Sequence, residues 1–67
     1  MSGFEIEGCR CVRDSGKAIL VESAEDPING SVWVPQSQVH EDSEVYQEGD
    51  EGTLVVSEWW AEQQGWM

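Results

Sequence analysis

The apolar residues of this chain occur in short runs separated by turn-forming residues, and this spacing points to a β-rich fold. Residues 18–21, 32–34 and 54–56 are rich in aliphatic side chains, most of them β-branched, and lie close to glycine or proline. Runs of this length with such flanks are typical of strands. Apolar and acidic residues alternate over residues 4–7, which predicts a strand with one buried face. A chain of 67 residues has room for one domain, which we place at residues 1–67.

The first strand is expected to run over residues 4–13 with an irregularity in its middle. Gly8 interrupts the alternation, and Cys9 and Cys11 are the next pair expected to point inward. A glycine where the alternation changes phase predicts a β-bulge. Residues 14–16 end in glycine and are expected to form the turn of a hairpin.

The second strand is predicted at residues 18–22, and its apolar stretch 18–21 indicates a central strand covered on both faces. A loop is expected at residues 24–30. Within it, Asn29 and Gly30 offer a turn that accepts positive φ angles.

The second half of the chain is predicted to contain further short elements and a terminal helix. In order, these are a strand at residues 31–34 stopped by Pro35, a helical turn at 36–39, a brief edge strand at Val45 and Tyr46, a turn at 48–52 and a strand at 53–56. Ser57 is a suitable N-cap for a helix of about two turns from Glu58 to Gln64, and Gly65 is expected to end it.

These elements predict a mainly β fold of the α+β type. We expect a strongly bent antiparallel sheet of four or five strands, similar to an SH3-like or small partly open barrel, with a short C-terminal helix covering one side. The candidate core residues are Phe4, Ile6, Ile19, Leu20, Val21, Val32, Trp33, Val34, Val45, Leu54, Val55, Val56, Trp59 and Trp60. So small a core leaves little room for a deep catalytic cleft, so we do not expect an enzyme.

Charge is distributed very unevenly along the chain, which has a formal net charge of −11. In residues 1–17 three acids balance Arg10, Arg13 and Lys17, whereas residues 18–67 hold eleven acids and no lysine or arginine. Such a surplus opposes direct contact with a nucleic-acid backbone. It favours a basic protein as partner. The three bases surround one hairpin, where we expect them to pair with neighbouring acids.

An acidic run at residues 41–51 is the main candidate binding surface. Its carboxylates belong to Glu41, Asp42, Glu44, Glu48, Asp50 and Glu51, and Glu22, Glu25, Asp26, Glu58 and Glu62 would extend the surface. Carboxylates on neighbouring strands repeat every ~4.8 Å across a sheet, so they would present a field comparable with that of duplex DNA. The competing interpretations are an ordinary solvated face and adaptation to high salt.

The sequence predicts no cofactor, metal site or membrane segment. The acids do not match the spacing of a calcium-binding loop, and two cysteines alone cannot complete a zinc site. Cys9 and Cys11 would lie about 6.7 Å apart along a strand, which disfavours a disulfide, so we expect buried free thiols. Without a signal peptide or a long apolar run, we expect a cytoplasmic protein. We also expect it to be a monomer.

The aromatic residues and the single histidine have both packing and functional interpretations. Trp59 and Trp60 point about 100° apart on a helix, so one should pack on the sheet while the other lies at its margin. An exposed tryptophan, there or at Trp33, would suit a partner contact. His40 is expected to be solvated, and no nucleophile motif accompanies it.

Three segments together resemble small proteins encoded by phages and mobile elements. They are KAILV at residues 17–21, VWVPQSQ at 32–38 and GTLVVSEWWAE at 52–62, followed by Gly65. The related pattern has a lysine at the position of Gln36. In size and acidity the chain is also similar to the anti-CRISPR proteins with which phages block type I interference complexes. That resemblance implies a DNA mimic that occupies the basic groove of the Cascade complex in a bacterial cytoplasm.

Two functions from different classes follow from these observations. The first is an inhibitor that binds the basic DNA-handling surface of a type I CRISPR effector by acidic mimicry. The second is an SH3-like accessory module of a phage or mobile element, which recognises a peptide through exposed tryptophans and whose acids are merely solvated. Binding that falls with salt distinguishes the first from the second.

Overall fold

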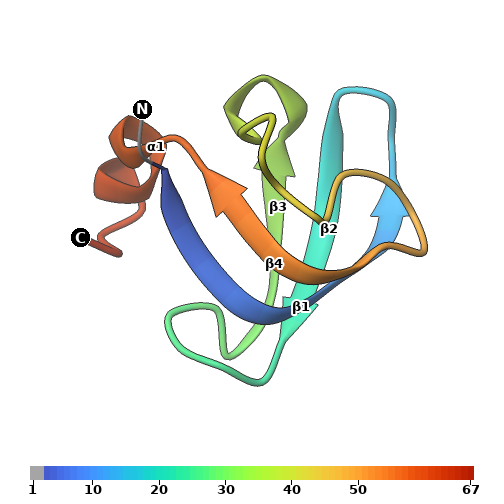
Figure 1. The fold of residues 1–67 in the computed structure, drawn as a ribbon, viewed down its shortest axis with the longest axis horizontal. Coiled ribbons are helices and arrows are strands. Elements are labelled where there is room, and N and C mark those ends of the chain that lie inside the picture. Colours follow the sequence, from blue (N-terminus) through green and yellow to red (C-terminus); the bar gives the residue numbers. More distant parts are fainter. Residues whose placement is uncertain (1–2) are drawn as a thin grey trace.

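The computed structural model describes residues 3–67, which form a four-stranded sheet followed by a short helix (Figure 1). The elements are β1 Phe4–Asp14, β2 Ala18–Ser23, β3 Gly30–Pro35, the 3-10 turn η1 Gln36–Gln38, β4 Glu51–Val56 and α1 Glu58–Gln63. The mainly β fold, the antiparallel sheet and the C-terminal helix are therefore confirmed. Pro35 is the last residue of its strand, and β4 begins at Glu51, inside the segment predicted as a turn.

The sheet has the strand order β3-β2-β1-β4, and all its pairs are antiparallel. β1 is long enough to serve two neighbours. Its first part, from Phe4 to Arg10, pairs with β4, and its second part, from Arg10 to Asp14, pairs with β2. The strand curves strongly between these parts (Figure 1). Within the described residues β3 and β4 do not pair with each other, so the sheet stays open.

The bend in β1 coincides with the glycine that interrupts its sequence pattern. The pairing with β4 shifts between Ile6 and Cys9, and Gly8 has a φ of 70° in the left-handed region. The predicted bulge is confirmed. A second shift lies between Cys11 and Arg13, where no glycine gives a signal in the sequence. Both shifts raise the local twist of the strand and help it to wrap around the core.

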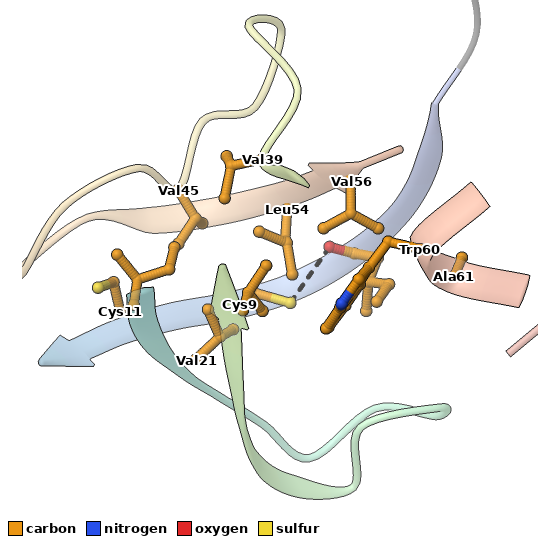
Figure 2. Packing of buried hydrophobic residues seen from close by; sticks show 12 residues of the cluster. Cys9, Cys11, Val21, Val39, Val45, Leu54, Val56, Trp60 and Ala61 are labelled. Carbon is orange, nitrogen blue, oxygen red and sulfur yellow. Dashed lines mark hydrogen bonds between the residues drawn. The ribbon is translucent and has the colours of Figure 1, made fainter. Parts of the chain in front are cut away.

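The core lies on the concave face of the sheet and is closed by the loop after η1 and by α1 (Figure 2). It contains Ile6, Cys9, Cys11, Ile19, Val21, Val34, Val39, Val45, Leu54, Val56, Trp60 and Ala61. Phe4, Ile28, Val32 and Trp66 pack against it while remaining partly exposed. Most of the aliphatic core residues predicted from the sequence are buried. Trp33 and Trp59 are not, with 47% and 62% of their surface exposed.

β2 is central in the sheet, as expected, but it is not covered on both faces. Ile19 and Val21 are fully buried on the core face. Leu20 lies between them on the opposite face and is only half-buried, and Glu22 on that same face is exposed. An unbroken apolar run indicates a strand here but does not reveal how much of its second face another element covers.

The loop between η1 and β4 replaces the edge strand predicted at Val45 and Tyr46, and that prediction is wrong. Val45 is fully buried although it belongs to no strand, while Tyr46 is 47% exposed. The loop enters beside β4 through a single bridge between Val39 and Val56. An apolar residue is used at position 45 because the side chain is buried, and an apolar residue between polar ones resembles a strand in the sequence.

Backbone and side-chain groups of this loop satisfy the outer edge of β4. The backbone N–H of His40 donates to Val55 O at 2.8 Å, and that of Glu44 donates to Thr53 O at 2.9 Å. The N–H of Val55 donates to the Ser43 hydroxyl at 3.0 Å, and that of Thr53 donates to the Glu44 carboxylate at 2.9 Å. Two side chains thus take the place of carbonyl oxygens of a neighbouring strand.

The C-terminal helix begins where its cap was predicted. The Ser57 hydroxyl accepts a hydrogen bond from Trp60 N, and Gly65 follows the last turn with a φ of 79°. Trp60 lies against the core with its ring edge-on to Trp66, their centroids 5.1 Å apart. The helix therefore covers one side of the sheet through the second of its two tryptophans, as Figure 2 shows.

We predict that Ser43→Ala lowers the free energy of unfolding by about 1–3 kcal/mol, because the N–H groups of Val45 and Val55 then lose their acceptor. The midpoint of urea unfolding measures this change. Ser37→Ala is the matched control, because Ser37 is exposed and its side chain makes no hydrogen bond among the described residues. Equal midpoints for the two variants would contradict the proposed role of Ser43.

Candidate functional site

The acidic run at residues 41–51 lies mostly in the loop that borders β4, not on a regular strand. The regular spacing assumed for its carboxylates is therefore wrong. Two of its six acids support the loop itself. Glu44 accepts from Thr53 N, and Asp50 accepts from Tyr46 N and Gln47 N, each at 3.0 Å. Their carboxylates are thus already engaged with the backbone.

The other acids of the run keep their carboxylates toward solvent. Glu41 and Glu48 are exposed and have no hydrogen bond or ion pair from their side chains within residues 3–67. Asp42 lies 3.7 Å from Nδ1 of His40. Glu51 lies 4.0 Å from Nε of Arg10, and both side chains are more than half exposed, so this pair contributes little to stability.

A second acidic group crosses the outer face of the sheet. Arg10 is the strand partner of Glu22 in β2 and of Glu51 in β4, but among the described residues its guanidinium forms an ion pair only with Glu51. Next to this row, the bulge leaves an open pocket of about 540 Å³ lined by residues 8–10, 22–24, 51 and 52. Glu25 lies beside Gly8 at its margin.

The remaining predicted acids are distributed around the molecule. Asp26 belongs to the loop between β2 and β3 and is exposed. Glu58 and Glu62 lie on α1, where Glu62 is exposed and Glu58 is half-buried. In Figure 1 the helix and the chain around residues 46–50 lie at opposite sides of the molecule. The acids therefore do not form a single face.

The three basic residues lie on β1 and its hairpin with β2. Arg10 has the ion pair with Glu51, whereas Arg13 and Lys17 have no ion pair among the described residues. The expectation that all three pair with acids is therefore correct only for Arg10. The Asp14 carboxylate accepts from Gly16 N and from the Gln36 amide instead.

Two tryptophans are exposed at places that suit contact with a partner. Trp33 pairs with Leu20 across β3 and β2, and Leu20 pairs with Arg13 of β1, so the three side chains form a row on the outer face. Trp59 lies on the outer side of α1 and is 62% exposed. The prediction that one of Trp59 and Trp60 packs inward while the other remains at the margin is confirmed.

His40 is not the solvated histidine that the sequence suggested. Its side chain is only 15% exposed and lies where the loop meets β4. Nδ1 accepts a hydrogen bond from Asp42 N at 3.1 Å. The ring therefore supports the turn that follows it.

Cys9 and Cys11 are buried free thiols, as predicted. The Cys9 thiol donates to Ile6 O at 3.3 Å (Figure 2), and that of Cys11 donates to Arg13 O at 3.1 Å. Burial raises the pKa of both thiols above the usual value, and the hydrogen bonds only partly oppose this effect. They therefore belong to the core and not to a reactive site.

Comparisons with known proteins add no relative from which function can be transferred. No family model, curated protein or solved structure matches the chain. Among residues 3–67 no group of three or more histidine, cysteine or acidic side chains is arranged to hold a metal ion. No helix in the same part of the chain is long and apolar enough to cross a membrane.

Several residues that shape this surface have no clear signal in the sequence. In the sequence Ser43 resembles an ordinary polar loop residue. In the structure its hydroxyl hydrogen-bonds to the backbone of Val45 and accepts from the N–H of Val55 in β4. The pocket beside Gly8 follows from the bulge, which was predicted, but its lining depends on pairing between distant strands. The exposed tryptophans, Trp33 and one of the helix pair, are predicted from the sequence as possible contacts.

We predict that the stability of the protein falls as the pH rises above about 8.5, where the thiols of the unfolded chain ionise while those of the folded chain stay protonated. Below that pH the stabilising contribution of the protonated thiols is fully present. Urea unfolding at several alkaline pH values measures the decline. It should be smaller in the Cys9→Ala, Cys11→Ala double variant, and an unchanged decline would assign it to other groups.

Proposed function

We propose that this protein binds a basic, nucleic-acid-handling surface of another protein and blocks it by presenting carboxylates in place of phosphates. The observation that carries the proposal is the lack of internal counterions. Glu22, Glu41 and Glu48 are exposed and have no ion pair within residues 3–67. Folding leaves their charge available to a partner.

The arrangement of the fold favours this use of the charge. The loop before β4 is fixed by hydrogen bonds to the strand, so Glu41 and Glu48 are held on an ordered backbone. Ordered charges need less reorganisation on binding than those on a flexible tail. Among the described residues, Arg13 and Lys17 form no ion pair with the acids of this loop.

The target that we propose is the DNA-binding groove of a type I CRISPR effector complex in the bacterial cytoplasm. The support for this target is the similarity of the chain in size and acidity to phage anti-CRISPR proteins, together with its net charge of −11. A groove that holds DNA offers rows of lysine and arginine, and exposed carboxylates on a small rigid domain are suited to it. No catalytic step is needed for such inhibition.

The test is competition between the protein and target DNA for a purified type I effector complex. We expect the protein to lower DNA binding in a mobility-shift assay at low salt, and the effect to weaken steeply as salt rises. No inhibition at any salt concentration would reject the CRISPR effector as target. Inhibition that is insensitive to salt would reject acidic mimicry and favour recognition through an exposed tryptophan.

A pair of matched variants separates the surface from the net charge. Glu41→Lys with Glu48→Lys should weaken binding at least about tenfold, equivalent to about 1.4 kcal/mol, because both carboxylates belong to the proposed surface. Glu5→Lys with Glu7→Lys changes the net charge equally on exposed positions of β1. Equal losses for both pairs would show that total charge, and not this surface, determines binding.

A further inference from the structure

The two edges of the sheet differ in how their backbone groups are satisfied. The edge of β4 is covered by the loop before it, through His40, Ser43 and Glu44. Within residues 3–67 the backbone of β3 pairs only with β2, and neither a loop nor a side chain hydrogen-bonds to its other edge. Alternate residues of β3 therefore direct their N–H and C=O groups outward without a partner among the described residues.

The free edge also lies in the only long uncharged part of an otherwise highly charged chain. Residues 27–39 contain no acidic or basic side chain, and this is the longest such segment in the sequence. Edge strands are commonly protected by charged side chains, proline or bulges. Here Pro35 protects one end, but Ser31, Val32 and Trp33 carry no such protection, and Trp33 is 47% exposed.

From these observations we propose that two copies of the protein associate through β3 in antiparallel fashion, forming one continuous eight-stranded sheet. A strand edge is its own complement when a second copy is related by a two-fold axis. A second copy suits this edge better than a charged peptide does, because β3 has no charged side chain that could bind such a peptide. The outer row of Leu20 and Trp33 would continue into the same row of the second copy.

This dimer departs from the monomer expected from the sequence, and its salt dependence follows from the net charge of the chain. Two chains of net charge −11 repel each other, although β3 itself carries no charged side chain. Raising the salt concentration screens the repulsion, so dimerisation should strengthen with salt. Binding to a basic partner should weaken under the same conditions, which distinguishes this association from the proposed function.

The experiment is sedimentation velocity of the full chain up to about 1 mM protein, at salt concentrations from about 0.05 M to about 1 M. We expect a dimer fraction that rises with both protein and salt concentration. Hydrogen exchange on the same samples should show added protection at alternate amides of β3 as the dimer forms. A monomer throughout both ranges would overturn the proposal.

Two matched pairs of variants locate the interface. Trp33→Lys should weaken the dimer at least tenfold, whereas Trp59→Lys, on a tryptophan that is also exposed, should not. Ser31→Glu places a charge on the edge, and Ser37→Glu places the same charge on the exposed η1. Circular dichroism confirms that each variant folds. A dimer unchanged by both Trp33→Lys and Ser31→Glu would place the contact elsewhere and overturn the proposal.

Discussion

The two halves of the sheet share β1, and the packing of the protein depends on the bend that lets one strand serve both. At the bend, Arg10 faces Glu22 of β2 and Glu51 of β4. The shift at Gly8 turns the strand while keeping Ile6 and Cys9 on the core face. Ile6 and Cys9 are three positions apart, so in a regular strand they would point to opposite faces of the sheet. One of the two side chains would then be exposed to water. The concave core and the outer pocket are therefore two results of the same bulge.

Acidic residues and uncharged residues lie at different edges of this sheet. The loop beside β4 holds most of the acidic run, while β3 at the other end of the strand order has no charged residue. The loop satisfies the edge that it covers and at the same time presents exposed acids such as Glu41 and Glu48. The segment that satisfies the edge of β4 thus also carries the acids of the proposed binding surface, whereas the edge of β3 has no charged side chain.

The elements that could be predicted from the sequence are those whose determinants lie close together in the chain. Ser57 and Gly65 bound the helix through local hydrogen bonds and backbone angles, and Gly8 marks a change of phase within one strand. The loop before β4 could not be predicted, because Val45 is buried by distant strands and Ser43 bonds to a residue twelve positions away. For the candidate surface, the sequence identified the acids but not which ones the backbone uses. Which carboxylates accept hydrogen bonds from the backbone depends on how the loop lies against β4.

The contact between Glu44 and β4 has a consequence for how the sequence can change over time. Gly52 has a φ of 138°, and a Cβ atom at this position would overlap the Glu44 side chain. A larger residue at position 52 would therefore push the carboxylate away from Thr53 N, which it caps. Replacing Glu44 would remove this overlap, but the φ of 138° would still disfavour any side chain at position 52. Glycine at position 52 is therefore favoured twice, by its own backbone angle and by the carboxylate that caps the edge of β4, whereas position 44 has only the second constraint.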